Sequence, residues 1–131
     1  MVCLDTDLLV ALLRGEPRAV SSIEKLEGEG EHLATSAISA YELLKGAIIS
    51  SRRNENLKLV EDLLSSIPIL PVSLKSSEAS ATIYGELASK GRIIGELDIL
   101  IAGICAYNDE LLVSNDRHFQ EIGRMLNLVS W

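Results

Sequence analysis

Aromatic residues, cysteine and proline are all scarce in this sequence. Phe, Trp and Tyr make up 4% of the 131 residues, and there are 2 cysteines and 3 prolines. Cys3 and Cys105 stand inside apolar segments, so we expect both to be small buried hydrophobic residues. His32 and His118 lie far from them and from each other, which leaves no zinc-binding spacing and no Cys-His nucleophile pair.

Long apolar runs are absent as well. No run reaches the length that crosses a bilayer, and the first apolar run has no basic segment ahead of it and is interrupted by Asp5 and Asp7. We therefore expect a cytoplasmic protein with neither a membrane span nor a signal peptide.

Positive charge is the third shortage. The chain has 12 basic residues against 19 acidic ones, which gives a net charge of −7. A chain with this balance does not hold nucleic acid by charge alone, because phosphate binding needs a basic surface. Any nucleic-acid function must therefore explain how an acidic chain tolerates phosphate, and bound divalent cations are one answer.

Aliphatic residues are abundant, since hydrophobic residues make up 47% of the chain. With few aromatics, this composition suits helices packed on a parallel sheet. Strands alternate with helices, which predicts an α/β fold: one domain, residues 1–131, with a doubly wound, mainly parallel sheet in an α/β/α sandwich. We expect strands at 2–4, 32–34, 67–72 (an edge strand), 111–113 and 128–131. We expect helices at 8–13, 18–27, 35–49, 57–64, 73–90 and 96–108, a helical turn at 118–123 and a polar connector at 52–56.

The turn from Leu4 to Asp7 joins the first strand to the first helix. Open α/β sheets bind ligands at the carboxyl ends of their strands, so Asp5 is a candidate ligand-binding residue. The alternative is that an acid here caps the helix, and Asp7 is the better cap.

Glu42 has a structural alternative that its local sequence favours. The stretch from Ser39 to Glu42 fits a capping box, in which the acid returns to the Ser39 backbone N–H, and Lys45 is close enough to pair with Glu42. However, Glu42 shares a helical face with Ile38 and Ile49, which places it among apolar neighbours.

Asp98 and Asp116 are the other two candidate site residues. Asp98 falls in the first turn of a helix and shares a face with Ala102 and Cys105, so it points inward, where a carboxylate needs a partner or a metal. Glu96 is expected in solvent. Asp116 follows the strand at 111–113, in a stretch that also fits an Asx-type turn.

A parallel sheet gathers the carboxyl ends of its strands at one edge, so the acids are expected to meet there. Carboxylates brought together raise each other's pKa, and a divalent cation relieves the repulsion. Oxygen ligands without His or Cys fit Mg²⁺ or Mn²⁺ rather than zinc. The expected set is Asp5, Glu42, Asp98 and Asp116.

Four segments in order resemble the motifs of PIN-domain ribonucleases, and most of all those of the VapC-type toxins of prokaryotic toxin–antitoxin pairs. Residues 4–7 resemble the opening motif, with Asp7 where Asn is more usual. Residues 38–43 match the segment that carries the glutamate, and residues 97–102 are similar to an Asp-x-x-Ile-Ala helix. Residues 113–119 match the closing motif, with Ser114 where Thr is common. The resemblance covers essentially the whole chain.

The resemblance implies a PIN-like fold and an endoribonuclease that hydrolyses RNA phosphodiester bonds with a water activated by one or two Mg²⁺ or Mn²⁺ ions. It implies that the four acids are the catalytic, metal-binding set, with Thr6 and Ser114 in support. It also implies three partners: an RNA substrate, a small VapB-like antitoxin and a second copy of the chain in a homodimer. We expect five basic residues in or beside the motifs to line the RNA path: Lys45, Arg52, Arg53, Arg92 and Arg117.

Three alternatives share parts of this pattern. Haloacid-dehalogenase-type phosphatases open with a nucleophilic Asp, as Asp5 would be, and a second Asp two residues later, but they require Thr or Val where Leu9 stands. Response-regulator receivers need a Lys where Ser114 follows Val113. A PIN-like binding module without activity is the third, and the presence of all four acids argues against it.

Overall fold

The computed structural model describes residues 1–131 and contains five strands, six α-helices and one 3₁₀ segment. The first half of the chain comprises β1 (Val2–Leu4), α1 (Thr6–Leu13), α2 (Pro17–Gly28), β2 (Leu33–Ser36), α3 (Ala37–Ile49) and α4 (Arg53–Ser66). The second half comprises β3 (Ile69–Leu70), α5 (Leu74–Ser89), α6 (Glu96–Tyr107), β4 (Leu111–Val113), η1 (Arg117–Met125) and β5 (Leu128–Val129).

The five strands form one sheet in which every pair of neighbours is parallel. Their order is β3-β2-β1-β4-β5, so the first strand of the chain lies at the centre. Val2 is level with Leu33 of β2 and with Leu111 of β4. Because all strands run the same way, their carboxyl ends lie at one edge, and the loops that follow β1 and β4 begin side by side there.

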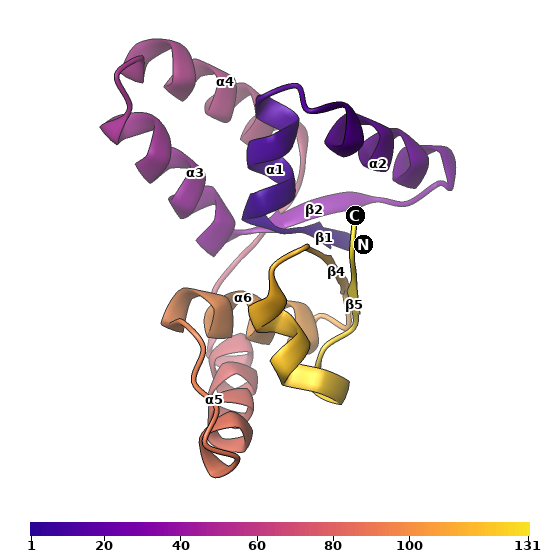
Figure 1. Ribbon diagram of the computed structural model, residues 1–131, viewed down its shortest axis with the longest axis vertical. Helices are drawn as coiled ribbons and strands as arrows, with labels where there is room; N and C mark the ends of the chain where they lie inside the picture. The colour runs from indigo at the N-terminus through magenta and orange to yellow at the C-terminus, as the bar shows by residue number, and fades with distance from the viewer.

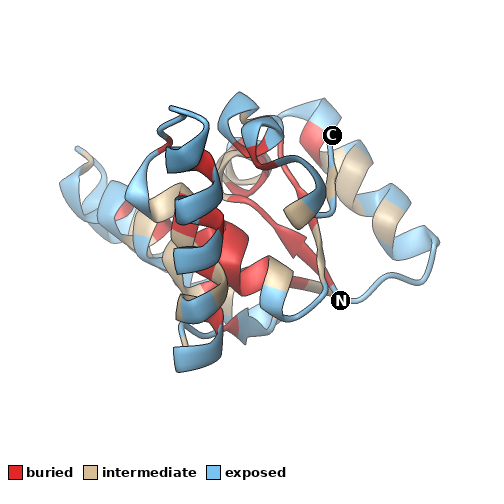
Figure 2. Cartoon of the chain, turned by 90° about the horizontal axis from the view of Figure 1, so that it is seen from below, coloured by how far each residue is buried: buried red, intermediate tan, exposed pale blue.

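Helices cover both faces of the sheet. Figure 1 shows α1 to α4 on one side of the strands and α5, α6 and η1 on the other. Val2 and Leu4 pack with the first layer, whereas Cys3 and Leu112 pack with the second. In Figure 2 the strands and the inner helix faces form the buried centre. The predicted α/β/α sandwich is confirmed, and so is the burial of Cys3 and Cys105.

Helices α5 and α6 approach each other closely at Gly103. A Cβ at this position would lie 1.8 Å from Ser80 Oγ and 2.7 Å from the carbonyl oxygen of Ser76, so only glycine fits. Its neighbours Ala102 and Ala106 are small as well, which favours such an approach. The contact fixes α6, whose first turn carries Asp98.

Helices α3 and α4 are among those that begin at residues other than the predicted ones. Thr35 and Ser36 continue β2, so the helix predicted at 35–49 begins at Ala37. The Thr35 hydroxyl donates to the carbonyl of Leu4 at 2.7 Å, which holds this β-branched residue in the sheet. Helix α4 begins at Arg53, so most of the predicted connector at 52–56 is helical. No Gly or Pro stands there to prevent a helix.

The predicted edge strand at 67–72 is an edge strand, but only Ile69–Leu70 pairs with β2. Pro68 and Pro71 flank the pair and remove the backbone donors that a longer ladder needs. Among the helices, none combines the length and the apolar character that a membrane crossing demands.

Candidate active site

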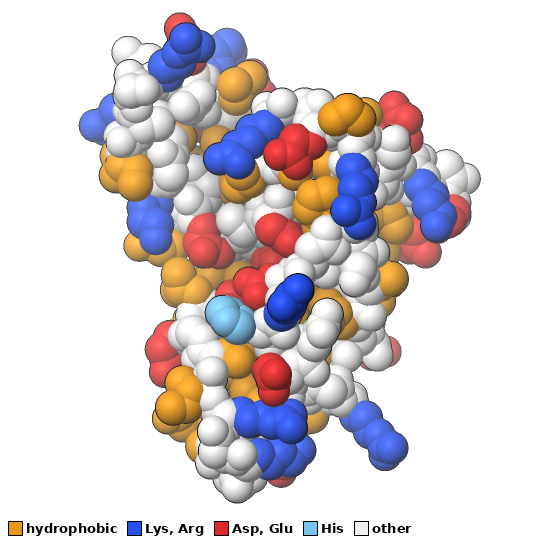
Figure 3. All heavy atoms as spheres, in the orientation of Figure 1, with side chains coloured by type: hydrophobic (Ala, Val, Ile, Leu, Met, Phe, Trp, Pro, Cys, Tyr) orange, Lys and Arg blue, Asp and Glu red, His pale blue; other side chains and the backbone are white.

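Four acidic side chains meet at the carboxyl edge of the sheet. Asp5 follows β1, Asp116 lies beyond the end of β4, Glu42 is on α3, and Asp98 is in the first turn of α6. The charge of Asp98 acts on Asp5, and the charges of Asp116 and Glu42 act on Asp98. Figure 3 shows acidic side chains gathered beside a histidine where the two helical layers meet. The structure therefore brings together all four acids that the sequence singles out, and we call them the acidic group.

Asp5 is the most deeply buried member, with 4% of the residue exposed. Its Oδ2 accepts a hydrogen bond of 2.6 Å from the Ser114 hydroxyl. Burial raises the pKa of Asp5 to about 7; the hydrogen bonds from Ser114 and Thr6 oppose the rise, and the charges of Asp7 and Asp98 add to it. This carboxyl therefore keeps its proton to a higher pH than an ordinary Asp, unless a cation binds beside it.

Asp98 lies between the other acids. Its side chain is 21% exposed, and its Oδ2 lies 3.2 Å from Nδ1 of His118. Burial raises the pKa of Asp98, the hydrogen bond with His118 lowers it, and the charges of Asp116 and Glu42 raise it further. Asp5 and Asp98 thus both carry a cost of ionisation that a bound cation would remove.

Ser114 links Asp5 to Asp116. Its hydroxyl oxygen donates to Asp5 and accepts the backbone N–H of Asp116 at 3.0 Å. Asp116 Oδ1 in turn accepts the backbone N–H of His118 at 2.9 Å, so Asp116 is the N-cap of η1. The Asx-type turn and membership of the acidic group, which the sequence offered as alternatives, are both present.

Glu42 is held by Thr6. The Thr6 hydroxyl donates to Glu42 Oε1 at 2.8 Å and lies 3.0 Å from Ser39 Oγ, which joins α1 to α3. The N-cap of α3 is Ser36, whose hydroxyl accepts the Ser39 N–H at 3.0 Å. The capping box predicted for Ser39 and Glu42 is therefore wrong. Because the helix begins after Ser36, Glu42 lies in its second turn and is free to face Thr6.

A second set of hydrogen bonds fixes the loop after β4. Asp7 Oδ2 accepts the backbone N–H of Asn115 at 2.8 Å, and Asn115 Oδ1 accepts the backbone N–H of Trp131 at 2.9 Å. Arg18 extends this series of hydrogen bonds, because its guanidinium donates to the Trp131 carbonyl at 2.8 Å. The prediction that Asp7 caps α1 is wrong, because the helix already begins at Thr6 and Asp7 lies inside its first turn.

His118 belongs to the site, and the sequence analysis missed it. Its Nδ1 lies 3.2 Å from Asp98 Oδ2 and 3.5 Å from Asp116 Oδ1. One ligand atom from each of these three residues lies within 4.8 Å of the others. The available signal was the spacing, since a turn that begins at Asp116 brings the residue two positions later back toward it.

The five basic residues expected along an RNA path are dispersed. Three of them have partners outside the acidic group: Lys45 lies over the ring of Tyr41 (5.2 Å), Arg52 near Glu55 (3.9 Å) and Arg92 near Glu121 (3.2 Å). Arg53 begins α4. Arg117 is exposed and directly follows Asp116, so it alone adjoins the acidic group in sequence.

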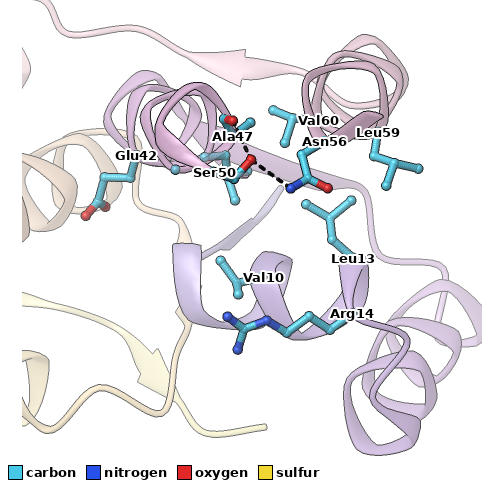
Figure 4. A pocket seen from close by; sticks show the side chains of 11 residues that line it. Val10, Leu13, Arg14, Glu42, Ala47, Ser50, Asn56, Leu59 and Val60 are labelled. Carbon is cyan, nitrogen blue, oxygen red and sulfur yellow. Dashed lines mark hydrogen bonds between the residues drawn. The ribbon is translucent and has the colours of Figure 1, made fainter. Parts of the chain in front are cut away.

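A groove opens beside Glu42, between α1, α3 and α4. It encloses a cavity of about 320 Å³. Figure 4 shows Glu42 at one end of the groove, an aliphatic wall that includes Val10, Leu13 and Val60, and the Arg14 side chain extended along α1. Arg14 is a second residue near the site that the sequence analysis did not single out.

The donor atoms of the site suit a hard divalent cation. Carboxylate oxygens from separate elements converge, and such oxygens are the usual ligands of Mg²⁺ and Mn²⁺. The raised pKa values of Asp5 and Asp98 have burial as their main cause, which shows that these groups are poorly compensated by the protein alone. The residues present therefore fit a bound divalent metal ion.

Comparison with known proteins agrees with this geometry. The family model described as the PIN domain matches residues 2–125. Ribonuclease VapC19 of Mycobacterium tuberculosis is 36% identical over 124 residues, which cover 91% of this chain and 92% of the relative. Ribonuclease VapC2 of Haemophilus influenzae is 31% identical over 120 residues, which cover 91% of this chain and 89% of the relative.

Solved structures show the same similarity. The crystal structure of VapBC2 from Rickettsia felis bound to a DNA fragment from its promoter superposes with a TM-score of 0.90 at 28% identity and covers 100% of this chain and 99% of that one. DNA-bound VapBC from Salmonella typhimurium gives a TM-score of 0.89 at 27% identity, with coverage of 100% and 99%.

Proposed function

The chain belongs to the PIN-domain family, and on this premise we propose that it is a metal-dependent endoribonuclease and the toxin of a VapBC-type toxin–antitoxin pair. The observation that carries the proposal is the convergence of four carboxylates, Asp5, Glu42, Asp98 and Asp116, at one edge of a parallel sheet. The ribonuclease names of the relatives support RNA as the substrate.

In the proposed reaction the acidic group would hold Mg²⁺ or Mn²⁺, and the bound ion would supply positive charge for the scissile phosphate and lower the pKa of the attacking water. The Ser114 hydroxyl orients Asp5, and the Thr6 hydroxyl orients Glu42. A bound cation would favour the ionised form of Asp5, so Asp5 would be one of the residues that hold it.

Cleavage of a pooled RNA substrate by the wild type and by Asp98→Asn tests the proposal. We expect the wild type to lose activity in excess EDTA and to regain it with Mn²⁺, whereas Asp98→Asn stays inactive in both. Glu96→Gln is the matched control, since Glu96 is exposed in the same helical turn and should leave activity unchanged. Wild-type cleavage that persists in excess EDTA would overturn the proposal.

We propose that Lys45, Arg52, Arg53, Arg92 and Arg117 contact the RNA backbone. Arg52 and Arg53 are exposed and adjacent, so a double Gln variant removes two contacts without disturbing the core. We expect weaker RNA binding and a shallower dependence of affinity on salt, measured by filter binding with the metal held constant. A double Gln variant of the exposed Lys25 and Lys58 is the control. Equal RNA affinity of the wild type and the double Arg variant would show that Arg52 and Arg53 do not contact the RNA backbone.

We propose a small VapB-like antitoxin as the protein partner, because structures with a high TM-score are VapBC complexes. The groove beside Glu42 offers an aliphatic surface on which such a partner can bury apolar side chains next to the acidic group. A candidate antitoxin should abolish RNA cleavage at a one-to-one ratio. Cleavage that continues with the antitoxin in excess would remove it as the partner.

We also propose that the chain forms a homodimer. Tyr41, Ile48 and Ile49 on α3, together with Ile69, leave apolar surface exposed around a shallow hollow on the outside of the molecule. A double Glu substitution at Ile48 and Ile49 should give a monomer in sedimentation equilibrium, whereas Leu74→Glu, exposed elsewhere, should not. A monomeric wild type would contradict the proposal.

A further inference from the structure

His118 faces two members of the acidic group at once. Its Nδ1 lies 3.2 Å from Asp98 Oδ2 on α6 and 3.5 Å from Asp116 Oδ1 on the loop after β4. The backbone reinforces this arrangement, because the His118 N–H donates to the carboxylate of Asp116 at 2.9 Å. The next residue, Phe119, is 1% exposed and anchors η1 in the core, so packing holds the backbone from which the His118 side chain extends.

These distances match those between neighbouring ligands of one metal ion. Ligand atoms about 2.1 Å from an octahedral ion lie about 3 Å apart when they occupy adjacent corners. The two distances from Nδ1 are close to this value, and one ligand atom from each of the three residues lies within 4.8 Å of the others. A small movement would therefore place Nδ1 and the two carboxylate oxygens on a common ion.

We propose that His118 is a metal ligand of this site, binding through Nδ1 together with Asp98 and Asp116. The inference rests on the proposed function, because it assumes that the acidic group holds a divalent ion. It adds a nitrogen donor to a set that the sequence analysis treated as oxygen alone.

The nitrogen donor has a consequence for the choice of metal. Mg²⁺ is bound mainly by oxygen ligands and water, whereas imidazole binds the later divalent transition ions more readily. The site therefore favours Mn²⁺ over Mg²⁺ by a larger margin than the four carboxylates alone would give. The competing explanation is that His118 forms only an ion pair with Asp98, and at 61% exposure such a pair contributes little.

Pulsed electron paramagnetic resonance of the Mn²⁺-loaded protein separates these explanations, because it detects nitrogen bound directly to the ion. The chain has only two histidines, so the signal can be assigned with two variants. We expect an imidazole signal from the wild type and from His32→Ala, and none from His118→Ala. Circular dichroism melting confirms that each variant is folded.

Metal affinity provides the second measurement. Titration calorimetry of His118→Ala should show Mn²⁺ binding weakened by about tenfold or more, with a smaller effect on Mg²⁺. Wild-type Mn²⁺ binding that is lost in Asp98→Asn but shows no imidazole signal would overturn the role of His118 and leave the metal-dependent function intact. Mn²⁺ binding that Asp98→Asn does not weaken would overturn the metal site itself.

Discussion

Replacing Asp5 by Asn tests how much free energy the burial of one carboxylate costs the metal-free protein. Asn has nearly the same shape as Asp, and its carbonyl can still accept the hydrogen bond from Ser114. The carboxyl has its ordinary pKa of 3.8 in an unfolded chain, and burial raises that pKa to about 7 in the folded protein. The substitution removes this difference and little else.

The sign of the effect follows from the two pKa values. Below pH 4 the carboxyl is mostly protonated in both states, so its burial costs little. Between pH 4 and pH 7 the unfolded chain loses the proton while the folded protein keeps it, so stability falls as the pH rises. Above pH 7 both states are ionised and the full cost is present. The difference in pKa corresponds to about 4 kcal/mol at most, since water that enters the site reduces it.

Urea unfolding in EDTA at pH 4 and pH 8 provides the measurement. We expect Asp5→Asn to be more stable than the wild type by about 2–4 kcal/mol at pH 8 and by less than about 1 kcal/mol at pH 4. Asp62→Asn is the control, since Asp62 is exposed on α4 and should change little at either pH. Mn²⁺ at pH 8 should stabilise the wild type far more than Asp5→Asn. A difference between wild type and variant that does not depend on pH would refute the reasoning.

Three further substitutions test other contacts. Gly103→Ala should destabilise the protein by about 1–3 kcal/mol in urea unfolding, because the added methyl overlaps Ser80. Gly85→Ala is the control: this position has open space around it, so the substitution should stabilise α5 by up to about 1 kcal/mol. Thr6→Val should lower kcat for RNA cleavage by about tenfold, since Glu42 loses its hydrogen-bond donor; unaltered kcat would show that Thr6 does not position Glu42. Asn115→Ala should loosen the loop after β4, because the side chain no longer accepts the Trp131 N–H, and it should weaken Mn²⁺ binding in calorimetry. Asn54→Ala, exposed in the first turn of α4, should not; an equal loss of Mn²⁺ affinity in both variants would contradict a local effect.

The sequence was informative wherever one local pattern determined the structure. The apolar segments that became β1 and β4 each end at a polar turn, so Asp5 and Asp116 could be placed at strand ends without any knowledge of tertiary contacts. Gly103 could likewise be recognised as a point of close helix packing from its small neighbours.

The sequence was misleading where a boundary of one or two residues decides what a side chain contacts. Whether Ser36 ends a strand or lies inside a helix determines whether Glu42 turns back to its own helix or faces Thr6. That choice depends on the pairing of Ser36 in β2 with Leu70 in β3, which local propensity does not encode. His118 escaped notice for a related reason, since Asp98, which it contacts, lies on another element.

The central place of β1 also determines when this protein can become active during its own synthesis. Residues 2–4 leave the ribosome long before β4, which must pair with them and comes near the end of the domain. The hydrogen bond between Asp5 and Ser114 joins positions 109 apart. A nascent chain therefore carries no assembled cleavage centre while it is surrounded by messenger and ribosomal RNA. The topology therefore delays nuclease activity until translation of the domain is almost finished. Up to that point no inhibitor is needed.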